Sequence, residues 1–542
     1  MQHLFSQIPK ADIQRSSFDR SHGYKTCFDS GYLVPFFVDE VLPGDTFNLQ
    51  ATILARLSTP IVPIMDNLFL DTFFFFVPNR LVWDNWQKFM GEQVNPEDTI
   101  DYLVPTIQAP SGGFEVGSVA DYFGIPTGVP NIKVNALPFR AYNKIFQEWF
   151  KCEYLQPAPP LNHGDGPDDP ADYSLLRRCK RPDFFTSSLP YPQKFSSPNV
   201  PIYGETVPVI YDAKTSSITF DQSASIFRGT YDDGHYVKYS GLYFPSTSDG
   251  VSLPFAFTGP STFDSGVDNV AYNKSYGLTN ISGGSVDLSQ AAAININTIR
   301  QAFAIQRLLE RDARGGTRYT EILRSHFGVI SPDARLQRPE YLGGSSSLIN
   351  VHPVQQTSAS NDVTPQGNLA AFGVCGDKVH GFTHSFVEHG FIIGLVNVRA
   401  DLTYQQGLNK MWSRTTRFSY YWPSLAHLSE QPVLNKEIYA QGNEQDEQVF
   451  GYQEAFAEYR YYPSLVTSKL RSTANESLDV WHLSQKFESL PLLNADFIQD
   501  NPPLARALAV QNEPQFIMDT YFKMSCVRPM PLYGVPGLID HF

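Results

Sequence analysis

The chain has few of the residues from which covalent or metal-bound frameworks are built. Its five cysteines, spread over 542 residues, are odd in number and widely separated, and no two are spaced as CxxC. This pattern argues against a disulfide framework and against a zinc knuckle, and it indicates reduced thiols in a cytosolic setting. The five are Cys27, Cys152, Cys179, Cys375 and Cys526.

Long apolar runs are also missing. The first residues, MQHLFSQIPKADIQ, contain no apolar core of signal-peptide length. The strongest apolar run, Phe73 to Val77, is far shorter than the roughly 20 residues that a membrane-spanning helix needs. The sequence therefore predicts a soluble protein made inside a cell, with no membrane insertion.

No familiar catalytic or phosphate-binding motif is present. There is no P-loop, no Gly-x-Ser-x-Gly elbow, no His-Glu-x-x-His and no dinucleotide fingerprint. His380, His384 and His389, with Cys375 and Glu388 nearby, form the nearest metal candidate. On an extended backbone the first two of these histidines lie roughly 13 Å apart, too far for one zinc ion with bonds of about 2 Å. We interpret them as core or interface residues, and predict no catalytic, cofactor or metal site.

An acidic loop and the chain's many carboxylates leave two weaker alternatives. Asp165, Asp168, Asp169 and Asp172 resemble calcium ligands in composition but not in EF-hand spacing, so a solvated, proline-stiffened loop is predicted. A pair of carboxylates for glycoside hydrolysis stays an alternative, because nothing in the sequence distinguishes any two of the 55 acidic residues as such a pair.

Positive charge is scarce as well. The net charge is −14, so the chain as a whole is no neutraliser of nucleic acid. The first 25 residues carry a weak excess of 4 − 2 = +2, from Lys10, Arg15, Arg20 and Lys25 against Asp12 and Asp19. Two further basic clusters occupy 177–181 and 300–340. The second has eight arginines, five acids and no lysine, which favours structural ion pairs over DNA contact.

Aromatic residues, proline and glycine are plentiful. Aromatics make up 14% of the chain, beside 40 prolines and 37 glycines, while charged residues are only 18%. This composition is typical of a loop-rich β-protein. The aromatic excess predicts contact surfaces between subunits, although one large, tyrosine-rich core would give the same composition.

Strand patterns gather towards the two ends of the chain. Between residues 46 and 57, apolar residues from Phe47 to Leu57 alternate with polar ones, which predicts a half-buried strand. Other predicted strands cover 32–39, 67–77, 381–398, 449–461 and 515–527. A sheet that draws on both ends of a chain requires long-range pairing, as in a jelly roll with the middle inserted as excursions.

The middle of the chain is heterogeneous. Helices are predicted from Trp83 to Met90 and from Phe139 to Tyr154, followed by a proline-rich connector over 157–200. Residues 200–288, rich in Ser, Gly, Thr, Asp and Tyr, are predicted to form an exposed excursion that is either a binding surface or a tolerated loop.

The segment 308–344, LLERDARGGTRYTEILRSHFGVISPDARLQRPEYLGG, combines dense charge with helix signals. Ser289 is a predicted cap for a helix that passes Leu309 and stops at Gly315-Gly316. A second short helix is predicted over Tyr319 to His326, followed by a turn at 331–333.

Several long blocks resemble the major capsid protein of the Microviridae, the small single-stranded-DNA bacteriophages, and specifically its gokushovirus branch. They are FDRSHGYKTCFDSGYLVPFFVDEVLPGDTF (18–47), LPFRAYNKIFQEWF (137–150), 308–344, EHGFIIGLVNVRADLTYQQGL (388–408), MWSRTTRFSYYWPSLAHLSEQPVLNKEIY (411–439) and VRPMPLYGVPGLIDHF (527–542). The similarity runs nearly end to end and fades over 200–288.

The resemblance implies a mainly β protein: a single eight-stranded antiparallel jelly roll of viral capsid type, with long inserted loops and a few helices. The implied division is an arm with the first strands (1–80), inserted helices and loops (81–199), a variable insertion (200–288), a helical insertion (289–345) and the remaining strands with a C-terminal segment (346–542).

The implied function is structural, not enzymatic. Sixty copies would form, through pentamers, a T=1 icosahedral shell around a circular single-stranded DNA genome, and 200–288 would form threefold protrusions for host attachment. Implied partners are an internal scaffolding protein, a small basic DNA-packaging protein, a DNA pilot protein and a host surface receptor. The protein would reside in the virion after assembly in the bacterial cytoplasm. Lys10, Arg15, Arg20 and Lys25 are our candidates for DNA contact. The alternatives are a jelly-roll carbohydrate-binding or glycoside-processing protein, and an adhesin built around 200–288.

Overall fold

The computed structural model describes residues 14–92, 95, 97–195, 209–210, 228–230, 236–238, 285–286, 296–314, 325, 337–358, 365–426 and 428–533. The chain divides into two compact units, one formed by 1–197 with 306–542 and the other by 198–305. In the second unit the described strands are short: β8 (Val209–Ile210) pairs with β11 (Ser285–Val286), and β9 (Arg228–Thr230) with β10 (Tyr236–Lys238).

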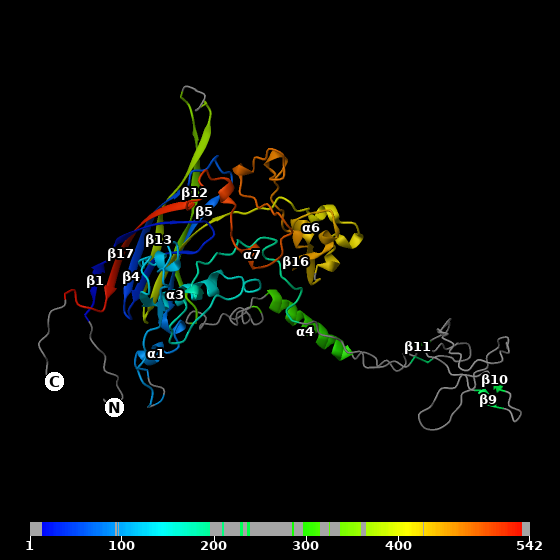
Figure 1. Cartoon of the computed structure of the whole chain (residues 1–542), viewed down its shortest axis with the longest axis horizontal. Coiled ribbons are helices and arrows are strands. Elements are labelled where there is room, and N and C mark those ends of the chain that lie inside the picture. Colours follow the sequence, from blue (N-terminus) through cyan, green and yellow to red (C-terminus); the bar gives the residue numbers. More distant parts are fainter. Residues whose placement is uncertain are drawn as a thin grey trace. The chain divides into compact units, whose positions relative to one another are not determined.

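The first unit is built on a large antiparallel sheet whose strands come from both ends of the chain (Figure 1). Its long strands form two groups of four neighbours, β2-β17-β4-β13 and β12-β5-β14-β3. The short strand β1 pairs with the same edge of β17 as β2, nearer the C-terminal end of β17. The strands are β1 (Ser16–Asp19), β2 (His22–Phe28), β3 (Val34–Val41), β4 (Thr46–Leu57), β5 (Leu68–Pro78), β12 (Glu340–Gln355), β13 (Leu369–Ser385), β14 (Gly390–Ala400) and β17 (Phe516–Arg528).

This order confirms the predicted eight-stranded jelly roll, in which the first and last strands are neighbours and each sheet alternates between early and late strands. The two groups are continuous through β12, whose residues 340–349 pair with β5 and whose residues 350–355 pair with β13. Beyond the other strands, β12 and β13 continue as a long two-stranded ladder (Figure 1).

The core lies between the inner faces of the two sheets. The predicted face of β4 is buried at every alternate residue from Phe47 to Leu57, and so is that of β17 from Phe516 to Cys526. Phenylalanines of β3 and β5 complete the core; the Phe36 and Phe74 ring centroids are 5.5 Å apart.

A second core covers the outer face of the β3-β14-β5 sheet. It is formed by the insertion after β5, chiefly α3 (Leu137–Ile145) and the π-helical turn Phe146–Phe150. Every residue of β14 is buried because this strand has a core on each face, and such strands lack an alternating pattern. This insertion also contains α1 (Trp86–Phe89), α2 (Val119–Tyr122), β6 (Thr106–Gln108) and β7 (Lys133–Asn135).

A third, smaller core joins the insertion between β14 and β17 to the segment around Phe185. It joins Phe185, Val433, Ile438, Phe450 and Phe497. The insertion's regular elements are short: β15 (Glu430–Leu434), α6 (Asn435–Ile438), β16 (Val449–Glu454) and α7 (Ala495–Ile498).

Several predicted boundaries were wrong. The strand predicted over 381–398 is the end of β13 and most of β14, separated by a turn at 386–389. The helix predicted to reach Tyr154 ends at Phe150, the one predicted over 83–90 is only Trp86–Phe89, and β16 stops at Glu454 rather than 461. α4 (Ile296–Arg314) is present where a helix was expected, whereas its predicted cap Ser289 and most of the predicted helix 319–326 lie outside the described residues.

Candidate assembly surface

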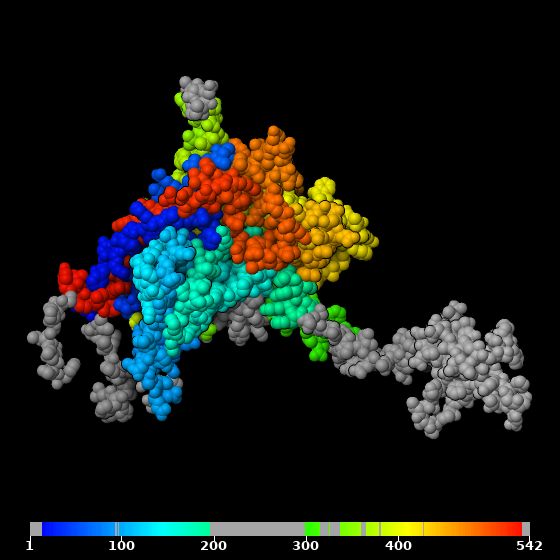
Figure 2. Space-filling view, viewed as in Figure 1, coloured from blue at the N-terminus to red at the C-terminus, as the bar shows by residue number. Residues whose placement is uncertain are grey.

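The most prominent surface feature is a group of exposed large apolar side chains in the segment after β14. Trp412 is 72% exposed and Phe418 is 73% exposed. Single exposed apolar residues are common on monomers, whereas a group of them indicates a contact surface. We call the group the aromatic surface; its members are Met411, Trp412, Phe418, Tyr420, Tyr421, Trp422, Leu428, Tyr459, Tyr462 and Leu465. They belong to the lobe coloured yellow to orange that projects from the jelly roll (Figure 2).

Short 3-10 turns and hydrogen bonds hold this surface in shape. The side chain of Arg414 donates to the carbonyl of Ser419 at 3.1 Å and to the carboxylate of Glu458 at 3.0 Å. Its guanidinium also lies 4.2 Å from the ring centroid of Tyr459. The indole of Trp422 donates to the carbonyl of Arg417. The exposed rings are therefore pre-positioned, which lowers the entropic cost of burying them against another molecule.

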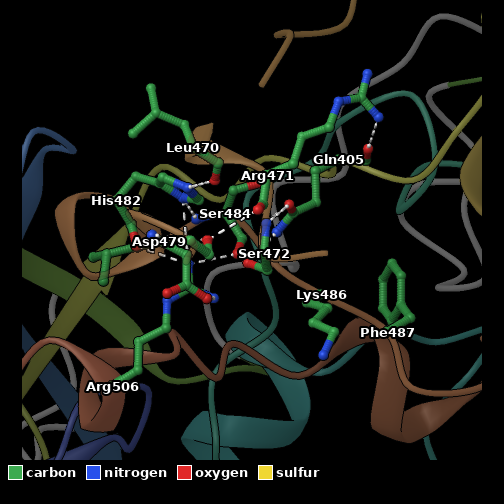
Figure 3. Close-up of polar contacts among 12 residues, drawn as sticks. Gln405, Leu470, Arg471, Ser472, Asp479, His482, Ser484, Lys486, Phe487 and Arg506 are labelled. Atoms are coloured by element: carbon green, nitrogen blue, oxygen red, sulfur yellow. Dashed lines mark hydrogen bonds and ion pairs between the residues drawn. The ribbon is translucent and has the colours of Figure 1, made fainter. Parts of the chain in front are cut away.

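A polar network fixes the neighbouring loop, residues 470–487 (Figure 3). His482 bonds through Nε2 to the carbonyl of Leu470 at 2.6 Å and accepts through Nδ1 from the Ser484 amide, which sets its tautomer with the proton on Nε2. The Arg506 guanidinium donates to the carbonyls of His482 and Ser484 at 2.7 and 2.8 Å. Gln405 holds Ser472 by a reciprocal pair of side-chain contacts.

A cavity of about 300 Å³ adjoins the aromatic surface at Leu465 and is bordered by Asp183, Tyr404, Lys410, Glu437 and Glu458 among others. Burial raises the pKa of the Glu437 carboxyl, and it raises the pKa of the Tyr404 hydroxyl well above its ordinary value. Each polar group already has a partner: Tyr404 donates to Asp183 at 3.0 Å, and Lys410 lies 3.4 Å from Glu437. These hydrogen-bonded and ion-paired side chains are arranged to stabilise the fold around the cavity, which is a structural role.

The basic cluster 177–181 is a structural strap between the jelly roll and the lobe. Arg178 pairs with buried Asp71 of β5 at 2.5 Å, and Arg399 of β14 pairs with the same carboxylate. Lys180 is buried beside the Phe497 ring, and burial lowers its pKa to about 8. Burial likewise raises the pKa of Asp500 to about 7, although Lys180 and the neighbouring arginines oppose that shift.

The acidic loop contains a second buried ion pair. Asp168 is 7% exposed and receives two 2.7 Å hydrogen bonds from Arg140, which is itself almost fully buried, and a third from the Tyr173 hydroxyl. The predicted solvated loop was therefore wrong for Asp168, because residues 160–173 fold against α3. Its neighbour Asp165 is exposed and accepts from the Trp83 indole at 2.7 Å.

The candidate DNA-contacting residues are dispersed. Lys10 lies outside the described residues. Arg15 donates to Thr46, Arg20 forms a two-bond ion pair with Asp39, and Lys25 on β2 is 3.1 Å from Asp519 on β17. The predicted arm thus becomes sheet at β1 and β2.

The histidine group is likewise spread over other contacts. The His384 ring packs against Phe386, the His389 ring against Trp86, and Glu388 pairs with Arg80 at 2.7 Å. Within the described ranges, no group of three or more potential ligands is placed to hold a metal ion. No helix in the described part of the chain has the length and apolar character needed to cross a membrane.

The subunit contact surfaces expected from the aromatic excess stay a prediction, and the sequence did not single out the members of the aromatic surface. The available signal was the run WSRTTRFSYYW at 412–422, in which aromatic and arginine residues follow neither a helical nor a strand period. The predicted Arg-centred pairing of 300–340 is present at Arg314, which pairs with Glu430 and lies 3.5 Å from Glu454.

Comparison with known proteins gives a consistent result. A family profile described as "Capsid protein (F protein)" matches residues 6–538. Capsid protein VP1 of Bdellovibrio phage phiMH2K is 48% identical, with 100% of this chain and 98% of the relative covered. Capsid protein VP1 of Chlamydia phage 1 is 47% identical, over 99% and 98% of the two chains. Capsid protein VP1 of Spiroplasma virus 4 is 38% identical, over 99% and 97%.

Proposed function

The chain belongs to the phage capsid protein (F protein) family, and from that premise we propose that sixty copies close, through pentamers, into a T=1 icosahedral shell around a circular single-stranded DNA genome. The work of the protein is assembly and not catalysis. A capsid protein of this family is a component of the virion; assembly takes place in the cytoplasm of the host bacterium.

The observation that carries this proposal is the aromatic surface. Its rings are exposed in the isolated chain, yet held by Arg414, Arg417 and Glu458 in fixed positions. Aromatic and arginine side chains are the residues that dominate binding energy at protein interfaces. Because the relatives are capsid proteins, the partner for this surface is another copy, and closed symmetry stops growth at a finite particle.

The charge of the subunit supports a separate cationic partner. Sixty copies at −14 each sum to −840, so the shell adds to the negative charge of the genome instead of offsetting it. We assign that compensation to a small basic DNA-packaging protein and counterions. The remaining proposed partners are an internal scaffolding protein, a DNA pilot protein and a host surface receptor.

Local contact with DNA is proposed for Lys10, Arg15, Arg20 and Lys25. Support comes from Lys25, whose side chain is 77% exposed on the sheet. Replacing all four by glutamine should lower the DNA content or the salt tolerance of particles while the subunit still folds. Unchanged DNA content and salt tolerance would exclude this role.

Host attachment is proposed for 200–288, as a surface protrusion at the threefold axes. Replacing this segment by a short Gly/Ser linker should leave particle formation intact and abolish adsorption to host cells. Adsorption at the wild-type rate would place the receptor-binding residues elsewhere.

Electron microscopy of the purified full chain tests the function as a whole. Uniform icosahedral shells are expected. Monomers or small oligomers that bind or hydrolyse glycans would instead support the carbohydrate-binding alternative.

A further inference from the structure

The outer face of the β2-β17-β4-β13 sheet carries more cationic than acidic side chains, although the chain as a whole is acidic. The side chains that alternate with the core residues of these strands are exposed, and no second core was found over them in the described structure, in contrast to the β3-β14-β5 sheet. With β1 included at its edge, the charged members of this face are Lys25, Arg56, Lys378 and Lys523 against Asp19 and Asp519.

This face has a net charge of 4 − 2 = +2 on a chain whose total is −14. One acid, Asp519, pairs with Lys25 at 3.1 Å, and the other, Asp19, accepts from both the amide and the hydroxyl of Ser21. The remaining exposed side chains include the neutral hydrogen-bonding groups of Asn48, Gln50, Thr52 and Ser525. Two apolar side chains, Leu54 and Ile517, are also exposed on this face, beside Asp519 and Arg56.

Tyr521 lies in the middle of this face and is 54% exposed. Its partners in the strand register are Gly23 on β2 and Thr52 on β4, so that neither cross-strand neighbour of Tyr521 has a large side chain. Lys523 lies two residues further along the same strand, about 7 Å away, and Lys378 pairs with Thr52, two strands or about 10 Å from Tyr521.

We propose that this face, which we call the basic sheet face, binds single-stranded DNA by stacking a base on Tyr521 while Arg56, Lys378 and Lys523 contact the phosphates. An exposed ring among cations on a sheet is the combination by which proteins hold single strands without reading sequence. Because cations outnumber acids on this face, it would repel a basic protein, which makes such a protein an unfavourable partner for it. The inference rests on the proposed genome-enclosing function and extends the DNA contact beyond the residues near the N-terminus.

Equilibrium binding tests the inference with the full-length, unassembled chain and a fluorescent 15-nucleotide oligodeoxythymidine over a series of salt concentrations. The triple variant Arg56→Gln, Lys378→Gln, Lys523→Gln should reduce the slope of log K against log salt by about 2, since each contact to a single strand contributes roughly 0.7. The control, with the same change of charge, is Lys133→Gln, Arg460→Gln, Lys469→Gln, at exposed positions away from this face, and it should retain the wild-type slope.

The ring is tested by a second pair of variants. Tyr521→Ala should weaken binding at least fivefold, and Tyr521→Phe should retain it, because stacking on an aromatic contributes about 1–3 kcal/mol per base. Thermal unfolding within the wild-type range verifies that each variant is folded. Ultraviolet cross-linking of wild-type particles, which needs no variant, should give a nucleotide adduct on the peptide that contains Tyr521.

The outcomes distinguish DNA binding by the basic sheet face from the proposed capsid function. Equal slopes for the two triple variants, equal binding by the alanine variant, or adducts confined to the aromatic surface would each overturn the basic sheet face. If the variant chains still form icosahedral particles, the capsid function stands. If the wild-type chain forms no particles, the proposed function fails whatever the oligonucleotide data show.

Discussion

Replacing Trp412 and Phe418 by alanine should abolish assembly at concentrations where the wild-type chain forms particles. The two rings are 72% and 73% exposed, and a whole aromatic residue buries about 150–250 Å², so roughly 140 Å² of each is available for a contact. At about 25 cal/mol per Å², full burial would contribute up to ~3.5 kcal/mol per side chain. Because ordering and desolvation oppose association, we expect at least ~1.4 kcal/mol each, or tenfold per residue.

Light scattering against protein concentration measures the threshold for assembly, and sedimentation velocity identifies the product. The double variant should raise the threshold at least a hundredfold, while its thermal unfolding as a subunit stays close to that of the wild type, since the lost rings contribute little to the isolated fold. Leu103→Ala is the matched control: this side chain is 84% exposed but lies outside the aromatic surface, and its loss should shift the threshold only slightly. An unchanged threshold in the double variant would refute the role of the aromatic surface.

Three further predictions concern the buried charges and one backbone contact. Asp168→Asn leaves Arg140 buried without its counter-charge and should lower the free energy of unfolding by about 3–5 kcal/mol, measured by urea denaturation; a change below ~1 kcal/mol would contradict the pairing. Burial raises the pKa of Asp500 from 3.8 in the unfolded chain to about 7, so between these pH values the folded state binds more protons than the unfolded state. The free energy of unfolding that Asp500 contributes therefore falls by up to about 4 kcal/mol as pH rises from 4 to 7. Asp500→Asn should make the melting temperature less dependent on pH and should raise the melting temperature at pH 8; an unaltered pH profile would refute the shift. Gly31 has φ +81° and a Cβ there would lie 2.0 Å from the Asp500 carbonyl oxygen, so Gly31→Ala should cost at least ~2 kcal/mol, and a wild-type melting temperature would argue against that contact.

The strands that were predicted well have one buried face and one exposed face. β4 and β17 alternate residue by residue, so their extents and inner faces could be predicted from sequence alone. β14 has no exposed face, and the turn before it, FVEH at 386–389, contains neither Gly nor Pro. Without alternation or a turn signal, β13 and β14 merged into one predicted strand.

The 16-residue strand β12 was missed for a different reason. Its sequence, EYLGGSSSLINVHPVQ, is rich in Gly and Ser, which have low strand propensity. Its place is set by pairing with β5 and β13, a tertiary effect that local pattern does not contain. In the same way, the composition showed an excess of aromatic residues, but the exposure of Trp412 and Phe418 follows from 3-10 turns that have no sequence period.

Native mass measurement of particles formed by the purified full-length chain tests the central claim most directly. A closed shell of sixty subunits of 60.9 kDa predicts a protein mass of about 3.7 MDa, with icosahedral symmetry in images of the same particles. A subunit count other than sixty, or a chain that stays monomeric under all conditions in which it is folded, would contradict it.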